Sequence, residues 1–217
     1  MATTTIGLVG AGTMGSGIAQ AGALSGYDVT MQDISDKQVA TGIKGITKSL
    51  ERLAAREKIS SDDQSSALAR IQGTTILEDL SECDVVIEAA TENIDLKIAV
   101  FGQLDELCKS DAILASNTSS LSITRLAAAT RRPDRVIGLH FFNPVPIMKL
   151  VEIVRALQTS DETFTEMDTL TRQLGKEPVS VQDSPGFVVN RMLVPMINEA
   201  ILCCMKASPV PRKSIQR

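Results

Sequence analysis

The 217-residue sequence predicts an α/β protein built on a doubly wound parallel sheet. Short apolar runs that are typical of buried strands alternate with helical patterns along most of the chain, and a glycine-rich turn directly follows the first run. Strands that alternate with helices at this spacing form βαβ units, in which the strands are parallel. The hydrophobic content of 43% is ample for the core that such a sheet needs.

The first unit starts with the apolar run 6–9, which is followed by Gly10, Ala11, Gly12, Thr13, Met14 and Gly15. This G-x-G-x-x-G pattern is typical of a Rossmann-type dinucleotide-binding unit. Gly10 permits the tight turn, Gly12 lets the backbone approach a pyrophosphate, and Gly15 lets the helix pack closely on the strand. The helix predicted from residue 13 to about 25 then directs its free N–H groups and the positive end of its dipole toward the phosphates.

The second strand is predicted at 29–32, and Asp33 stands at its carboxyl end. A carboxylate at this place accepts hydrogen bonds from a ribose diol and repels a 2′-phosphate. The expected cofactor is therefore NAD rather than NADP. A glycine-rich turn in some other α/β protein is the alternative, and the flanking strand, helix and acid argue against it.

The remaining patterns predict the later elements in order. Predicted helices cover residues 36–58, 62–71, 94–107, 123–129 and 162–174. Predicted strands cover residues 74–77, 84–88, 112–115, 136–139, 150–154 and 178–181. Ser60 or Ser61 is the expected N-cap of the helix at 62–71.

The segment 183–186, Asp-Ser-Pro-Gly, interrupts this alternation and predicts a domain boundary. Residues 1–184 are the expected dinucleotide-binding domain, and residues 185–217 are the expected start of a helical C-terminal domain. The helix predicted over 188–206 is apolar on nearly all sides, so it needs burial on more than one face.

Composition argues against several functional classes. The formal net charge is −4 and only 3% of the residues are aromatic, so neither a nucleic-acid partner nor a membrane partner is expected. The four cysteines lack disulfide or zinc spacing, and with a single histidine no metal site is expected. No apolar run reaches the roughly 18 residues of a membrane span. The first predicted strand leaves no room for a targeting peptide before it, and we expect a cytoplasmic, reducing location.

Polar segments at three strand ends are the candidates for chemistry. In open α/β sheets, ligands bind beyond the carboxyl ends of the strands, so 88–92, 117–120 and His140 should share one crevice with the glycine-rich turn. Imidazole has an unperturbed pKa of about 6.5, which suits proton transfer near neutrality. His140 could therefore take the proton of an alcohol as hydride leaves for a nicotinamide. A structural role for this histidine is the alternative.

Other polar residues have two interpretations each. Glu152 lies on the strand after His140 and could orient its ring, or it could be an ordinary strand-edge carboxylate. Ser119 and Asn117 offer hydroxyl and amide groups at a strand end, and helix N-capping is their alternative role. Asn190 could hold a substrate oxygen at the domain junction or bond to a helix end. The basic stripe within 44–58 is either a solvated face or a contact with a phosphorylated ligand.

Five motifs together resemble one family, the 3-hydroxyacyl-CoA dehydrogenases, and most closely its short bacterial type that acts on 3-hydroxybutyryl-CoA. The resemblance covers about 6–200 and is carried by Gly-Ala-Gly-Thr-Met-Gly (10–15), Glu-Ala-Ala-Thr-Glu-Asn (88–93), Ser-Asn-Thr-Ser-Ser (116–120), His-Phe-Phe-Asn-Pro (140–144) and Asp-Ser-Pro-Gly-Phe-Val-Val-Asn-Arg (183–191). It implies an NAD-dependent oxidoreductase. The implied reaction is reversible oxidation of an L-3-hydroxyacyl-CoA to the 3-ketoacyl-CoA, with acetoacetyl-CoA as the short substrate of the reverse reaction.

The resemblance also implies roles for matching residues. His140 matches the catalytic base, paired with Glu152, while Ser119 and Asn190 match the groups that hold the reacting oxygen and the thioester end of the substrate. Cofactor contacts beyond the glycine loop are implied for Asp33, Glu92, Lys97 and Asn117. Coenzyme A contacts are implied for Ser49 and Arg56, the latter at a position where a lysine can stand.

The end of the chain departs from the family pattern. Members carry a helical C-terminal domain that forms the homodimer interface and closes over the substrate, whereas residues 205–217 contain two prolines, four basic residues and no acid. Prolines disfavour a helix there. We expect a truncated or frame-shifted product, whose apolar helix packs back on the sheet, swaps with a second chain or stays exposed. The two functions that remain open are an active dehydrogenase and an NAD(H)-binding fragment without turnover.

Overall fold

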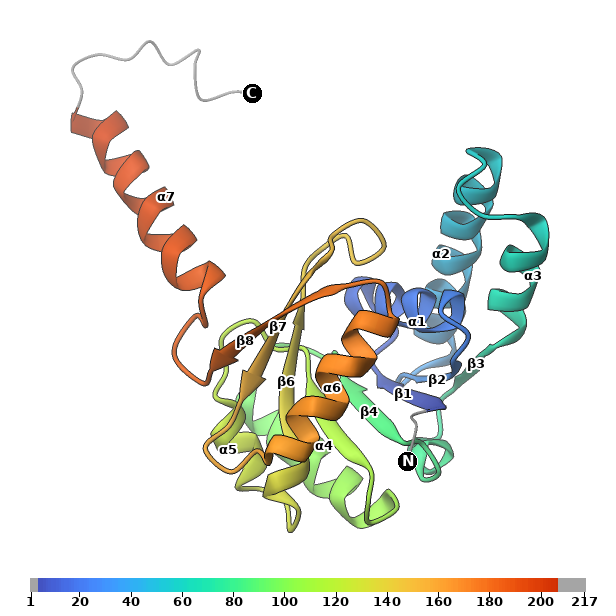
Figure 1. The fold of residues 1–217 in the computed structure, drawn as a ribbon, viewed down its shortest axis with the longest axis horizontal. Coiled ribbons are helices and arrows are strands. Elements are labelled where there is room, and N and C mark those ends of the chain that lie inside the picture. The colour runs from blue at the N-terminus through green and yellow to red at the C-terminus, as the bar shows by residue number, and fades with distance from the viewer. Residues whose placement is uncertain (1–3, 207–217) are drawn as a thin grey trace.

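The computed structural model describes residues 4–206. Its strands form one eight-stranded sheet in the order β3-β2-β1-β4-β5-β6-β7-β8 (Figure 1). The strands are β1 (Thr5–Val9), β2 (Asp28–Gln32), β3 (Ile71–Thr74), β4 (Val85–Glu88), β5 (Ile113–Ser116), β6 (Val136–Phe141), β7 (Leu150–Arg155) and β8 (Glu177–Gln182). The helices are α1 (Thr13–Leu24), α2 (Asp36–Ala55), α3 (Ser61–Ala69), α4 (Ile94–Leu107), α5 (Ile123–Ala127), α6 (Asp161–Gln173) and α7 (Val189–Lys206).

Two layers of core hold the sheet between its helices. Side chains of α1, α2 and α6 pack in one buried cluster, and those of α4 and α5 pack in the other. The central strands β4 and β5 are buried along their whole length, as expected for parallel strands covered on both faces. The predicted doubly wound α/β sheet is thereby confirmed.

One pair of strands departs from the parallel arrangement. β7 runs antiparallel to β6, with His140 opposite Glu152, while the other neighbouring pairs are parallel. Only the segment 142–149, which contains no helix, joins these two strands, and a connection of that kind returns the chain in the opposite direction. This reversal matters for the site because it brings two sequence-distant polar residues face to face.

The prediction of a strand at 74–77 is wrong, because the strand lies three residues earlier in the chain. β3 occupies Ile71–Thr74 and pairs with β2, and Leu77–Leu80 forms a single 3₁₀ turn, η1. The chain leaves α3 at Arg70 and enters the sheet at once, so the predicted helix 62–71 was also too long. At the other end, the Thr74 hydroxyl bonds to Asp79 at 2.5 Å and turns the chain away from the sheet. Of the two expected N-caps, Ser60 and Ser61, it is Ser60 that caps α3, and it forms a capping box with Asp63.

Helix α7 projects from the sheet rather than packing on it (Figure 1). The predicted helix at 188–206 is confirmed, with Pro195 inside it. Most of its large apolar side chains are exposed: Met192, Leu193, Val194, Met196, Ile197, Ile201 and Met205. None of the helices between residues 4 and 206 combines the length and hydropathy that crossing a bilayer would need. The atypical tail, from residue 207 onward, lies outside the described residues, and the division into residues 1–184 and 185–217 stays a prediction.

Candidate active site

The glycine-rich turn has the geometry that dinucleotide binding needs. Gly10 adopts φ +107° and donates its N–H to the Gln32 carbonyl at 2.7 Å, which closes the turn against β2. A Cβ on Gly15 would lie 1.8 Å from the Gly10 oxygen, so only glycine lets α1 start this close to β1. A Cβ on Gly12 would meet nothing within 4 Å, and no side chain caps the start of α1. The start of α1 is therefore open beside Gly12 and has no side-chain cap, as pyrophosphate binding at a helix N-terminus requires.

Asp33 lies at the predicted place, beside this turn. Its Oδ2 accepts the Ala11 N–H at 2.8 Å, and its Oδ1 accepts the Ile34 N–H at 2.7 Å. The parallel register of β1 and β2, in which Val9 stands opposite Gln32, brings the carboxylate to the loop. Asp33 thus organises the glycine loop, a role that the sequence pattern did not predict. Its contact with a ribose stays a prediction.

A buried ion pair lies under the end of β4. The Lys97 ammonium is 2.5 Å from Glu88 Oε1, and both side chains are almost fully buried. The other carboxylate oxygen of Glu88 accepts the Ser116 hydroxyl at 2.7 Å. Lys97 also lies 3.5 Å from Glu92 Oε2. Because a buried charged group needs a partner, the Glu88 carboxylate compensates the burial of the Lys97 side chain. Sequence reasoning placed Glu88 in the crevice and gave it no partner.

The segments after β4 and β5 are bonded to each other. Glu92 Oε1 accepts the Thr118 hydroxyl at 2.5 Å and the Ser119 N–H at 3.0 Å. The Asn117 side-chain oxygen accepts the Phe141 N–H at 3.0 Å and so joins β5 to β6. Helix N-capping, the alternative role of Asn117 and Ser119, does not apply to α5, because Ser122 caps it. The predicted crevice residues therefore do gather at one edge of the sheet.

His140 and Glu152 form the central pair of the site. Nδ1 of His140 lies 2.7 Å from Glu152 Oε2, and both residues are buried. β6 extends to Phe141, so His140 lies inside the strand rather than after it. The ring also packs against Phe142 and Phe187, with centroids 4.5 and 5.7 Å away. With Nδ1 engaged by the carboxylate, Nε2 is the nitrogen that can accept a substrate proton.

The same carboxylate holds the start of α7. Glu152 Oε1 accepts the N–H groups of Val188 and Val189 at 3.0 and 2.9 Å, which satisfies two donors at a helix N-terminus. At the second residue of the helix, the Asn190 side-chain amide donates to the Ser119 carbonyl at 3.2 Å. Ser119 and Asn190 are therefore neighbours across the predicted domain boundary, as a shared role in substrate binding requires.

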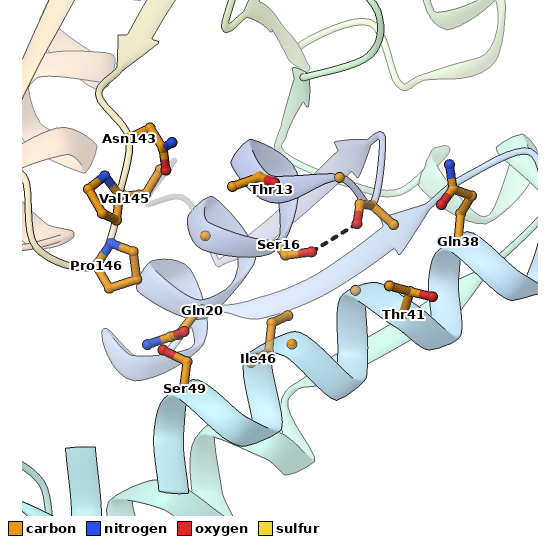
Figure 2. Close-up of a pocket in the computed structure, with 16 residues that line it drawn as sticks. Thr13, Ser16, Gln20, Gln38, Thr41, Ile46, Ser49, Asn143, Val145 and Pro146 are labelled. Atoms are coloured by element: carbon orange, nitrogen blue, oxygen red, sulfur yellow. Dashed lines mark hydrogen bonds between the residues drawn. The ribbon is translucent and has the colours of Figure 1, made fainter. Parts of the chain in front are cut away.

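Two connected grooves lie on the α2 side of the glycine loop. The larger, about 520 Å³, is bounded by the glycine loop, α1, α2 and the segment 143–146 (Figure 2). The smaller, about 280 Å³, shares Ser49, Pro144 and Pro146 with it and is also lined by Arg52 and Arg56. The side chains of His140 and Glu152 line neither groove, and the segment after β6 joins both grooves to His140. Asn143 and Gln20 line the larger groove and were given no role from the sequence, although Asn143 stands in a quoted motif.

The fold and the loop define an NAD-binding domain of the Rossmann type, and comparison with known proteins identifies the family. Residues 5–184 match the family model for the 3-hydroxyacyl-CoA dehydrogenase, NAD binding domain. The 3-hydroxybutyryl-CoA dehydrogenase of Clostridioides difficile is 47% identical over 196 residues, which span 90% of this chain and 70% of that protein. The corresponding enzyme of Bradyrhizobium diazoefficiens is 46% identical over 196 residues, 90% of this chain and 67% of that one.

A solved structure agrees with these relatives. The crystal structure of (S)-3-hydroxybutyryl-CoA dehydrogenase from Ralstonia eutropha superimposes with a TM-score of 0.94 at 54% identity, covering 98% of this chain and 75% of that one. The chain belongs to the 3-hydroxyacyl-CoA dehydrogenase family. The family resemblance, the NAD cofactor and the Rossmann-like fold are thus confirmed, and the roles of individual site residues stay predictions.

Proposed function

We propose that this chain is an NAD-dependent dehydrogenase of short-chain L-3-hydroxyacyl-CoA, oxidising 3-hydroxybutyryl-CoA and, in reverse, reducing acetoacetyl-CoA. The observation that carries the proposal is the buried His140–Glu152 pair at 2.7 Å, placed beside the strand ends of an NAD-binding domain. Relatives with the printed activity of 3-hydroxybutyryl-CoA dehydrogenase support the choice of substrate.

His140 is the proposed general base. Its Nε2 takes the proton of the substrate's 3-hydroxyl, and Glu152 stabilises the imidazolium that results and holds the ring in one orientation. When bound, NAD would supply the hydride acceptor. The pair is buried and the ring packs against Phe142 and Phe187, and a low-dielectric surrounding of this kind strengthens the electrostatic interaction with Glu152.

The remaining predicted residues hold the two ligands. For NAD, the glycine loop receives the pyrophosphate and Asp33 receives the adenosine ribose, while Glu92, Lys97 and Asn117 line the side toward the reacting centre. For the substrate, Ser119 and Asn190 hold the reacting oxygen and the thioester, and Ser49 and Arg56 hold coenzyme A in the connected grooves. A guanidinium such as that of Arg56 suits phosphate.

A second function has its own supporting observation. The exposed apolar side chains of α7 begin directly after Asn190, so the part of the site that holds the substrate rests on the least covered element. The chain would then be an NAD(H)-binding fragment without turnover. This alternative requires that residues 1–184 act as the binding domain and that 185–217 only begin the helical domain.

Oxidation of NADH by acetoacetyl-CoA, followed by NADH absorbance, tests both functions. We expect steady turnover that His140→Ala lowers by roughly 10²-fold or more. NADH binding by a folded chain that consumes no NADH in the presence of acetoacetyl-CoA would contradict the dehydrogenase proposal and support the binding fragment.

A further inference from the structure

Gln20 is a buried polar residue that the proposed mechanism does not use. It lies on α1, its side chain is 2% exposed, and its Nε2 atom has no hydrogen-bond partner among the described residues. Burying an amide without a hydrogen-bond partner destabilises the folded chain. Buried polar groups are nearly always hydrogen-bonded, so an exception beside a groove calls for an explanation.

The position of this amide points to a ligand in the larger groove. Gln20 lines that groove together with Ser49, and Figure 2 shows the two side chains at the same end of it. The terminal bond of a glutamine side chain has a broad, roughly two-fold torsion, so either edge of the amide can be presented to a bound molecule. Gln20 can therefore donate to, or accept from, a polar group that passes between α1 and α2.

The spacing along α1 indicates which ligand this is. Gln20 follows Thr13, the first residue of α1, by seven residues, which corresponds to about 10 Å along the helix axis. A pyrophosphate bound at the start of α1 is therefore two turns away from the amide. In the other direction, the larger groove continues past Ser49 into the smaller groove, which Arg52 and Arg56 line.

We propose that Gln20 is a substrate-binding residue that hydrogen-bonds the pantetheine chain of the acyl-CoA. That chain is linear, carries amide and hydroxyl groups, and links the thioester to the phosphates. Two connected grooves, with the Gln20 amide near Ser49 where they meet and guanidinium groups beyond, match this order of groups. The inference rests on the proposed function, and it makes Gln20 a determinant of selectivity for coenzyme A thioesters.

Calorimetric binding of acetoacetyl-CoA to the chain and to Gln20→Met tests the proposal. Methionine keeps the length of the side chain and removes both polar atoms. We expect the affinity for acetoacetyl-CoA and for free coenzyme A to fall by roughly 3- to 10-fold, the range of one neutral hydrogen bond. Affinities for NADH and for 3′-phosphoadenosine 5′-phosphate, which lacks the pantetheine chain, stay unchanged. The Tm does not fall, because the variant loses an unpartnered buried group.

Controls separate this result from a general defect. Gln103→Met makes the same change at an exposed position of α4, away from both grooves, and leaves all four affinities unchanged. Gln20→Ala replaces the methionine variant if that one does not fold. Unaltered acetoacetyl-CoA affinity, an equal loss for NADH, or no binding of acetoacetyl-CoA by the unmodified chain would each overturn the inference. Binding is measured without turnover, so an inactive chain that binds acetoacetyl-CoA through Gln20 contradicts the proposed function and leaves this inference standing.

Discussion

The sheet and helix α7 contain the same kinds of apolar residue, but those of the sheet are mostly buried and those of α7 are mostly exposed. In β7, Ile153 is fully buried between neighbouring strands and helices, whereas in α7 the side chain of Ile201 is 54% exposed. Burial of apolar area is the main favourable term in folding, so residues of the sheet carry the stability and those of α7 contribute little to it. The part that matches the NAD-binding family model, 5–184, is therefore also the part that holds its own core.

The largest expected effect tests this contrast with one substitution at two places. Ile153→Ala should lower the free energy of unfolding by about 2–5 kcal/mol, because it leaves a cavity in a packed core. Ile201→Ala should change it by less than about 0.5 kcal/mol, as is usual for exposed positions. Urea unfolding of both variants measures the difference. Similar losses for the two variants would show that α7 is buried in solution.

The second prediction concerns the role of His140 in catalytic turnover. His140→Ala should reduce turnover of acetoacetyl-CoA by roughly 10²-fold or more, the typical contribution of a general base. The Kd for NADH should stay within about 2-fold, because the cofactor loop lies on other strands. Stopped-flow or steady-state absorbance of NADH measures turnover, and fluorescence titration measures binding. Undiminished turnover would remove His140 from the mechanism.

The third prediction concerns how the stability of the sheet domain depends on pH. Partial burial of Asp84 raises the pKa of its carboxyl, but the Lys109 ammonium and the backbone N–H groups of Thr4 and Thr5 outweigh this and hold that pKa well below its usual range. A lowered pKa in the folded state means that this stability is present above the unfolded-state pKa of about 3.9 and is lost as pH falls below it.

Asp84→Asn should therefore cost about 1–3 kcal/mol of unfolding free energy at pH 7 and less at pH 2–3. Urea unfolding at both pH values measures this. Asp111→Asn, which replaces another acid near the same end of the sheet, is the matched control and should show no such pH-dependent loss. A loss of equal size at both pH values would contradict the assigned role of the Asp84 charge.

The smallest expected effect concerns cofactor choice. Asp33→Asn keeps an acceptor for the Ala11 N–H and removes the negative charge. The ratio of NADH to NADPH affinity should fall by about 10-fold, because the repulsion of a 2′-phosphate is lost. Titration with both cofactors measures the ratio. If the ratio does not change, Asp33 serves only to organise the loop.

The sequence predicted the fold and the gathering of the site well because both follow from local patterns and parallel-sheet topology. The glycine motif fixed the first unit, and strand ends placed 88–92, 117–120 and His140 at one edge. Contacts that depend on pairing between distant segments were harder to predict. The bonds of Asp33 to Ala11 and of Asn190 to Ser119 join distant segments, and the Glu88–Lys97 pair depends on how α4 packs beside the end of β4, which no local pattern encodes.

The strand at 74–77 shows a different limit. Its β-branched residues favour a strand, yet pairing with β2 begins at Ile71, directly after α3, and is complete by Thr74. Tertiary pairing outweighed local propensity there. Glu152 was named as the partner of His140, but its second role at the start of α7 depends on the path of the chain after β8, which the sequence left open.

The two sets of hydrogen bonds that Glu152 makes have a thermodynamic consequence. One oxygen faces the imidazole and the other faces the first N–H groups of α7, so the two contacts share a single charge. Linked equilibria are reciprocal: whatever free energy the His140–Glu152 contact adds to the docking of α7, the docking of α7 adds to that contact. The contact at the start of α7 and the His140–Glu152 contact are therefore two readouts of one coupled equilibrium.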